Sequence, residues 1–237
     1  MKMVLDMHTH TIISGHAYST IDENVKYASS KGIELLGITE HSSGMPGAPN
    51  PIYFHNFKVV PRNLYGVEIM LGVELNIMDY TGKIDMDERT LKMMDIVIAS
   101  IHPPCIKPST IDDNTQALIG AIKNPFVDII GHPGDPRYPI DVKDVYEQAR
   151  LNNTLLEINN VSLSPVSFRS GSEKYLSEFL KLCKKDGMPI IISSDAHFYK
   201  SVGDFSYAEK FIIENNFTQE LVLNTSVDKF KMFFRKK

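Results

Sequence analysis

Short apolar runs rich in Val, Ile and Leu alternate along the whole chain with longer amphipathic segments. This alternation is typical of repeated βα units that form a parallel sheet. Strands are predicted over residues 4–7, 35–39, 70–75, 95–100, 127–131, 154–158 and 189–193. Helices are predicted, for example, over residues 22–31, 113–123, 142–152, 173–185 and 206–215. The pattern favours an α/β barrel in which residues 1–237 form a single domain.

Local signals refine this picture. Thr20 with Glu23, and Ser170 with Glu173, match the capping box, in which a hydroxyl and a carboxylate pair with free amides at a helix start. A turn around Gly82 predicts a hairpin between residues 76–78 and 84–86, appended to the third strand. The basic tail at residues 235–237 is expected to be solvated.

Composition narrows the class of protein. The net charge of −4 gives no reason to expect a polyanionic partner, so nucleic acid is not predicted as a ligand. Cys105 and Cys183 stand far apart, outside any CxxC spacing, which suits a reducing compartment. The chain opens on a predicted strand, and no apolar run approaches the roughly 18 residues of a membrane span. We therefore expect a cytoplasmic protein without membrane association.

Histidines and acids gather at or just beyond the predicted strand ends. The carboxyl ends of parallel barrel strands share one face, where barrel enzymes build their active sites. One ion uses about four to six donors, so a set of this size predicts a multinuclear metal centre and hydrolytic chemistry. The candidate ligands are His8, His10, His16, His41, Glu74, His102, His132, Asp195 and His197.

Spacing and charge support this interpretation. His8 and His10 are two residues apart on a predicted strand, so both are expected to face inward while Leu5, Met7 and Thr9 face the helices. Burying so many titratable groups without cations would cost several kcal/mol. The remaining histidine, His55, lies in a polar segment and is expected at the pocket edge or on the surface.

The chain resembles the PHP (polymerase and histidinol phosphatase) superfamily, and most closely its YcdX-type phosphatases. The motifs that carry the resemblance are DMHTH at 6–10, TEH at 39–41, GVE at 72–74, IH at 101–102, GHP at 131–133 and SDAH at 194–197. HAYST at 16–20, NTQA at 114–117, EINN at 157–160 and GSE at 171–173 are similar to the signatures of the narrower group. Where this chain has Glu40, Asp is common in the family, but this side chain is expected to point away from the site.

The resemblance implies a distorted TIM-like (β/α)7 barrel holding three divalent ions, usually Zn²⁺, with Mn²⁺ or iron as alternatives. It assigns His8, His10, Glu74 and Asp195 to the first ion, Glu74, His102 and His132 to the second, and His16, His41 and His197 to the third. Glu74 and Asp195 would bridge or bind the ions that activate water. The reaction implied is attack of a metal-activated hydroxide on a small phosphate monoester.

Residues for substrate binding are less well marked. Arg169 precedes a predicted helix start on the active face, so it is a candidate for binding phosphate oxygens. Arg62 and Arg137 are similar in type, and the alternative for each arginine is a surface salt bridge. Tyr18, Ser42 and Asn160 are candidates for the mouth of the site. Cys105 follows two prolines without an activating base, so a thiol nucleophile is not predicted.

Three other functions stay open. A non-phosphate hydrolase of the amidohydrolase type would normally keep one or two ions, and His16 argues against it. A nucleic-acid-processing PHP domain, such as a 3′–5′ exonuclease, predicts a basic stripe with interleaved aromatics, which the sequence lacks. A degenerate structural domain would have lost ligands. The substrate, the metal used in the cell and a homo-oligomeric state are not determined by the sequence.

Overall fold

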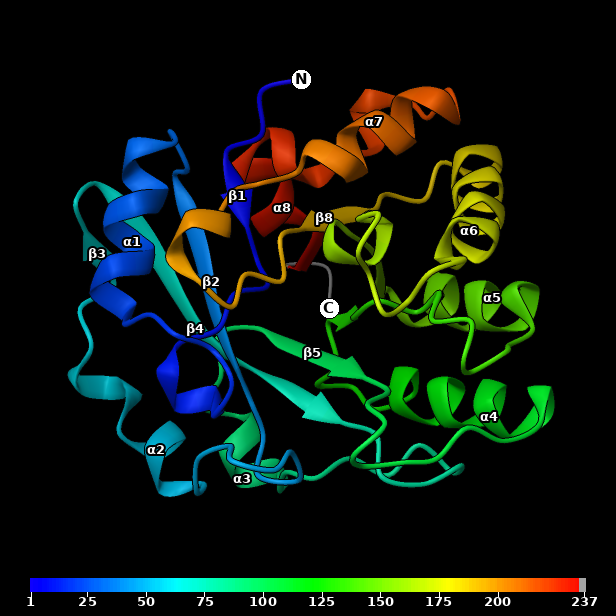
Figure 1. Ribbon diagram of the computed structural model, residues 1–237, viewed down its shortest axis with the longest axis horizontal. Helices are drawn as coiled ribbons and strands as arrows, with labels where there is room; N and C mark the ends of the chain where they lie inside the picture. The colour runs from blue at the N-terminus through cyan, green and yellow to red at the C-terminus, as the bar shows by residue number, and fades with distance from the viewer. Residues whose placement is uncertain (235–237) are drawn as a thin grey trace.

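The computed structural model of the protein describes residues 1–234 (Figure 1), so the tail predicted to be solvated lies outside the described residues. The strands are β1 (Leu5–Asp6), β2 (Leu35–His41), β3 (Asn63–Leu64), β4 (Val67–Asn76), β5 (Val97–Ser100), β6 (Ile129–Ile130), β7 (Leu155–Asn159) and β8 (Ile191–Ser193). The helices are α1 (Ile21–Ser30), α2 (Ile52–His55), α3 (Glu88–Leu91), α4 (Ile111–Ile122), α5 (Val142–Asn152), α6 (Ser172–Asp186), α7 (Ser206–Glu214) and α8 (Val227–Phe234).

The strands form one curled sheet in the order β1-β2-β4-β5-β6-β7-β8, with every neighbouring pair parallel. The short strand β3 was not predicted, and it pairs antiparallel with the first residues of β4. Beyond the strand ends, a parallel bridge joins Thr9 to Ala196. The first and last strands therefore meet, and the predicted distorted (β/α)7 barrel is confirmed.

The side chain of Asn224 helps to close the seam between β1 and β8. Asn224, in the short 3-10 helix Leu223–Thr225, donates from Nδ2 to the carbonyl oxygens of Leu5 and Ile192 at 2.9 and 2.6 Å. The Ile192 amide donates to Asn224 Oδ1 at 2.8 Å, and the Val4 amide donates to the Asn224 carbonyl at 2.8 Å. A single carboxamide thus takes the place of ladder hydrogen bonds between these two strands.

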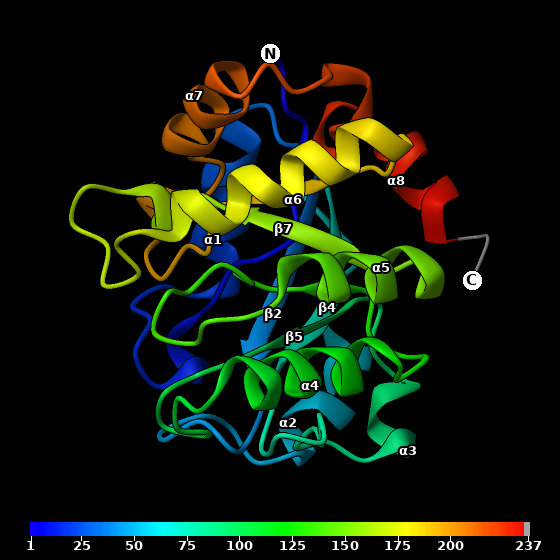
Figure 2. The same cartoon turned by 90° about the vertical axis from the view of Figure 1, so that its right-hand side faces the viewer.

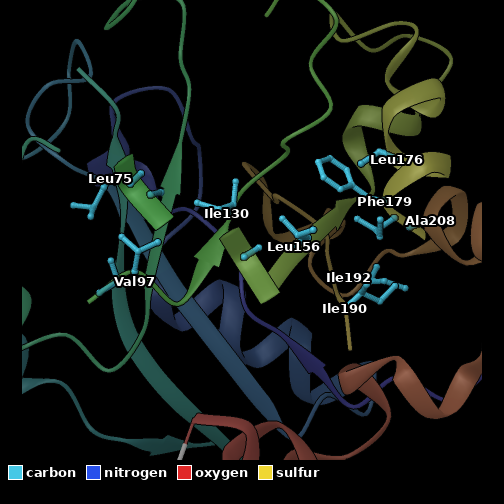
Figure 3. Packing of buried hydrophobic residues seen from close by; sticks show 14 of the residues in the cluster. Leu75, Val97, Ile130, Leu156, Leu176, Phe179, Ile190, Ile192 and Ala208 are labelled. Atoms are coloured by element: carbon cyan, nitrogen blue, oxygen red, sulfur yellow. The ribbon is translucent and has the colours of Figure 1, made fainter. Parts of the chain in front are cut away.

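Apolar residues pack on both sides of the barrel wall. Outside, Figure 2 shows α4, α5 and α6 lying side by side over the strands, and Figure 3 shows Leu156 of β7 near Phe179 of α6 within the larger buried cluster. Inside, alternate strand positions such as Ile98 form a second cluster, which Phe230 of α8 joins. Helix α8 was not predicted, and it places a ring in the inner core.

The first strand corrects one prediction. Leu5 and Met7 were expected to face the helices, but both belong to the inner cluster. Strand β1 ends at Asp6, so the two-residue alternation does not continue through His8 and His10. These two histidines reach the centre of the barrel because the chain leaves regular strand geometry after Asp6.

Local signals were partly right. Thr20 and Glu23 form the predicted capping box at the start of α1. The box predicted at Ser170 is wrong, because Gly171 is the N-cap of α6, at a left-handed φ of 96°, and makes no side-chain cap. The predicted hairpin is present as an antiparallel bridge between Ile77 and Ile84. None of the helices within residues 1–234 has the length and apolar character needed to cross a membrane.

Candidate metal centre

A cavity of about 710 Å³ opens at the carboxyl ends of the strands, and the predicted ligands converge there. Those that line it are His16, His41, Glu74, His102, His132, Asp195 and His197. His8 and His10 lie beneath, with no exposed surface, and contact Glu74 and Asp195. The structure brings all nine candidate ligands together.

Four of these side chains surround one point. Nε2 of His8 lies 3.3 Å from Glu74 Oε2 and 3.6 Å from Asp195 Oδ1. Nε2 of His10 lies 3.5 and 3.3 Å from the same two oxygens. Bonds of about 2.0–2.1 Å to a tetrahedral zinc ion would put ligand atoms about 3.3–3.4 Å apart. The spacing therefore fits one ion.

Glu74 divides its two oxygens between neighbouring groups. While Oε2 faces His8 and His10, Oε1 lies 3.2 Å from His102 Nε2 and 2.9 Å from His132 Nε2. A carboxylate placed in this way can bridge two cations. Glu74 is fully buried near the end of β4, where strand pairing aligns it with His41 of β2.

The outermost histidines form a third group. His16 Nε2 lies 3.0 Å from His197 Nε2, and the rings of His16 and His41 stack with centroids 4.9 Å apart. His41 stands between groups, because its Nδ1 is 2.9 Å from Glu74 Oε2 and its ligand atom also lies within 4.8 Å of those of His10 and His197.

Two candidate ligands have unusual backbone conformations. Gly131 faces inward, since a Cβ there would meet Ser100 Oγ at 2.3 Å, so regular alternation would turn the next residue outward. His132 instead has φ of 33°, which turns its ring toward Glu74. Asp195 has φ of 53°. A non-glycine residue at positive φ costs about 1–3 kcal/mol, and such strain concentrates at functional sites.

A layer of polar residues that the sequence analysis missed orients the imidazoles. Glu157 of β7 lies 2.8 Å from His8 Nδ1 and accepts from the His132 amide at 2.7 Å. Asn76 Oδ1 lies 2.8 Å from His102 Nδ1. Hydrogen bonds on Nδ1 leave Nε2 free to ligate. A polar residue within a buried apolar strand was the available signal for Glu157.

His10 is oriented through a relay. Its Nδ1 lies 3.2 Å from Ser14 Oγ, which donates to Glu40 Oε2 at 2.6 Å. Ser14 Oγ also accepts from the His41 amide at 3.0 Å. Glu40 does not line the cavity, in line with its expected direction, yet it acts on the site through this serine. Glu40 is therefore separated from the candidate ligand His10 by a single side chain, that of Ser14.

The profile of the PHP domain family matches residues 6–163. The chain belongs to the PHP family. A protein named "Probable phosphatase" from Caldanaerobacter subterraneus subsp. tengcongensis is 51% identical over 238 aligned residues, covering 100% of this chain and 93% of the relative. A protein of the same name from Clostridium novyi is 47% identical, covering 100% and 96%.

Solved structures show the same fold for this PHP chain. Histidinol phosphate phosphatase from Lactococcus lactis, in complex with zinc, L-histidinol and phosphate, superposes with a TM-score of 0.61 at 20% identity. The alignment covers 91% of this chain and 95% of that structure. The predicted family resemblance is confirmed.

Burial sets the charge state of several imidazoles in the PHP site. It lowers the pKa of His10 well below its usual range, and repulsion from His41 and His197 adds to the effect. It also lowers the pKa of His102 to about 4, although Glu74 opposes the shift. Neutral imidazoles are the form that binds metal ions.

The carboxylates favour positive charge at the centre. Burial alone would raise the pKa of Glu74, but the imidazoles of His8, His102 and His41 outweigh it and hold that pKa well below the usual range. Burial would likewise lower the pKa of His8, but Glu157 and Glu74 dominate and raise it. A cation is therefore favoured where His8 meets these acids.

Unpaired buried atoms support the same conclusion. Within the described part of the chain, the buried side-chain atoms without a hydrogen-bond partner include His8 Nε2, His10 Nε2, His41 Nδ1 and Glu74 Oε2. An unpaired buried polar group costs about 1–3 kcal/mol, so several facing one another indicate a missing partner. Nitrogen and carboxylate donors in this arrangement fit zinc or a similar divalent ion.

The three arginines have different positions in the PHP barrel. Arg169 is 5% exposed, lines the cavity and lies 3.4 Å from Asp195 Oδ2 through Nη1. Arg137 donates from Nε to both carboxylate oxygens of Asp135. Arg62 pairs with Asp95 before β5, at the opposite end of the sheet, so the structure does not bring it to the site.

The remaining residues considered from the sequence also differ in their position relative to the cavity. Tyr18 lines the cavity and is 75% exposed. Ser42 is buried and donates to Asp85, while Asn160 Oδ1 accepts from the first amides of α7, so neither lines the mouth. His55 lies 2.9 Å from Thr90 Oγ1, away from the cavity. Burial raises the pKa of Cys105 to about 11, so its thiol is not activated.

Proposed function

We propose that this PHP protein is a metal-dependent phosphomonoesterase that acts on a small molecule. The observation that carries the proposal is the convergence of nine donors, several with buried and unpaired atoms, on the floor of a cavity. The relatives named "Probable phosphatase" align over the whole of this chain, which supports the reaction class. The similar histidinol phosphate phosphatase was solved with zinc and phosphate, which supports the choice of metal and group.

Three ions per chain are proposed, with zinc as the expected metal and manganese or iron as alternatives. The ligand sets proposed are His8, His10, Glu74 and Asp195 for the first, Glu74, His102 and His132 for the second, and His16, His41 and His197 for the third. Distances between donor atoms support the first two sets, and the contact between His16 and His197 supports the third. His41 lies close both to Glu74 and His102 of the second set and to His197 of the third.

Bound ions of this kind supply Lewis acidity, polarise a phosphoryl oxygen and lower the pKa of water. The chain provides the geometry for that chemistry. Glu74 presents one oxygen to each of two donor groups, and its low pKa keeps it ionised. Asp195 is also ionised: burial would raise its pKa, but His8, with His10 and Arg169 nearby, outweighs burial and holds that pKa well below its usual range.

Arg169 is the proposed phosphate-binding residue. Its guanidinium is buried at the cavity wall, with Nη1 3.4 Å from both Ser162 Oγ and Asp195 Oδ2. These contacts are long, so donor capacity remains for a ligand. The Ser172 amide and hydroxyl both donate to the Arg169 carbonyl, which fixes the backbone before α6. A planar donor on a rigid turn suits a phosphate group.

Metal content and turnover test the proposal together. Protein stripped with a chelator and reloaded should bind up to three ions per chain and hydrolyse p-nitrophenyl phosphate in proportion to loading. Glu74→Gln should lose at least about 1,000-fold in turnover while remaining folded, because it removes the charge between two cations. Glu178→Gln, on the exposed face of α6, is the matched control and should behave like wild type.

Two results would overturn the proposal. One is a reproducible maximum of a single ion per chain after loading with excess metal. The other is fully loaded protein that cleaves a single-stranded oligonucleotide but no phosphate monoester. Wild-type turnover by Glu74→Gln would refute the bridging role separately.

A further inference from the structure

The mouth of the cavity differs in character from its floor. Above the histidines and acids, the wall is made of large apolar side chains, among them Tyr18, Met45, Pro103, Val161, Phe168 and Phe198. Tyr18, Phe168 and Phe198 are 75%, 63% and 42% exposed. Exposed aromatic rings grouped around a polar centre mark a binding surface, because such area is otherwise kept from water.

The cavity is larger than a phosphate group requires. Its volume of about 710 Å³ falls in the range that holds a drug-sized ligand. With the phosphate at the floor beside Arg169, the rest of the substrate must extend between the apolar walls. These walls therefore contact the leaving group.

The described residues that line the cavity offer no free carboxylate to a positive charge. Among the described residues that line the cavity, the acids are Glu74 and Asp195, and both face the histidines of the floor. Asp135, beside Arg169, is 5% exposed and receives a double hydrogen bond from Arg137. An ammonium group would find no free carboxylate.

Two arginines near Phe168 further disfavour binding of a cation at the mouth. The guanidinium carbons of Arg137 and Arg169 lie 4.9 and 4.7 Å from the centroid of the Phe168 ring. That ring therefore already contacts two cations, and their charges repel a third. Phe168 thus differs from the wall of an aromatic cage for quaternary ammonium groups.

We propose that the substrate's leaving group is an alcohol that bears a flat aromatic ring and no positive charge, bound against Tyr18 and Phe198, and that amino-alcohol phosphates are discriminated against. The inference rests on the proposed phosphatase function. It separates this chain in specificity from the histidinol phosphate phosphatase whose fold it shares.

A matched series of alkyl phosphates tests it on the metal-loaded protein. The esters are ethyl phosphate, 2-phenylethyl phosphate, 2-aminoethyl phosphate and L-histidinol phosphate. Burying the phenyl ring should raise kcat/KM for the phenylethyl ester about 10- to 100-fold over the ethyl ester. The two amino esters should fall at or below the ethyl ester, although their ammonium groups do not make the alcohol a poorer leaving group.

Variants test whether Tyr18 and Phe198 cause the preference for the phenylethyl ester. Phe198→Ala and Tyr18→Ala combined should reduce the phenylethyl-to-ethyl ratio to below about threefold. Tyr207→Ala, an exposed ring on α7 away from the cavity, is the control and should keep the wild-type ratio. The substrate series on the unaltered protein stands without the variants, should they fold poorly.

The outcomes are separable. If no ester is hydrolysed by protein carrying its full metal load, the proposed function fails. If esters are hydrolysed but the ethyl and phenylethyl compounds are equal within twofold, or an amino ester is preferred, the specificity inference alone is overturned. An unchanged phenylethyl-to-ethyl ratio in the double variant would likewise refute the role of Tyr18 and Phe198.

Discussion

Glu157→Gln should weaken metal binding without changing any ligand. The carboxylate is fully buried, with Oε1 2.8 Å from His8 Nδ1 and Oε2 accepting from the His132 amide at 2.7 Å and from Asn159 Nδ2 at 3.1 Å. All three partners present N–H groups to it when His8 Nε2 is the free nitrogen. Glutamine has nearly the same shape but only one accepting oxygen.

Neither orientation of the new amide preserves the arrangement. If its oxygen accepts from His8, its NH₂ group faces the donors of His132 and Asn159. If it is reversed, the NH₂ group faces His8 Nδ1 and favours the tautomer with the proton on Nε2, which cannot ligate. Loss of such an outer partner typically lowers metal affinity 10- to 100-fold, or about 1.4–2.7 kcal/mol.

The assay is zinc affinity, measured by competition with a fluorescent chelator at fixed pH, beside a thermal melt that establishes folding. The control is Glu178→Gln, which removes the same charge from the exposed face of α6. A folded Glu157→Gln protein whose zinc Kd is within about twofold of wild type would refute the reasoning, since His8 would then need no buried acceptor.

Three further changes test other parts of the structure. Arg169→Ala should lower kcat/KM for p-nitrophenyl phosphate about 10- to 200-fold and weaken inhibition by inorganic phosphate, whereas Arg62→Ala should change neither; equal kinetics in both variants would contradict the phosphate role. Cys105→Ser should retain turnover. Alkylation of Cys105 by iodoacetamide should be slow near pH 7 and accelerate toward its pKa of about 11, because only the thiolate reacts. Rapid loss of activity on alkylation at pH 7 would contradict this prediction. Asn224→Ala should lower the free energy of unfolding in urea by at least about 1–3 kcal/mol, because the buried Ile192 amide loses its acceptor; an unchanged midpoint would show that the seam tolerates the loss.

The sequence predicted most of the barrel because apolar runs alternate with amphipathic segments, and it predicted the candidate ligands because they follow the strand ends. His41, His102 and His132 follow apolar runs whose carboxyl ends must meet at one face, so their convergence needed no knowledge of contacts. In that sense, these candidate ligands could be identified from the sequence alone. The ion count and the role of each ligand remain predictions.

Other features depend on side-chain direction or on distant partners. Arg62 and Arg169 are the same residue type, and only the fold places one before β5 and the other in the cavity wall. Gly171 takes the N-cap position through a left-handed backbone, which a hydroxyl-based capping pattern does not detect. Glu157 was visible as an acid in an apolar strand, but its partner His8 lies 149 residues away.

The Asn224 seam has a consequence for synthesis on the ribosome. The carboxamide contacts Leu5 across 219 residues, and at about 5–20 residues per second this separation takes roughly 10–40 s to translate. Throughout that interval one edge of β1 is open, and exposed strand edges promote aggregation. His8 and His10 also emerge long before Asp195, so a nascent chain that captures an ion early must hold it with an incomplete set of ligands until the last strand arrives.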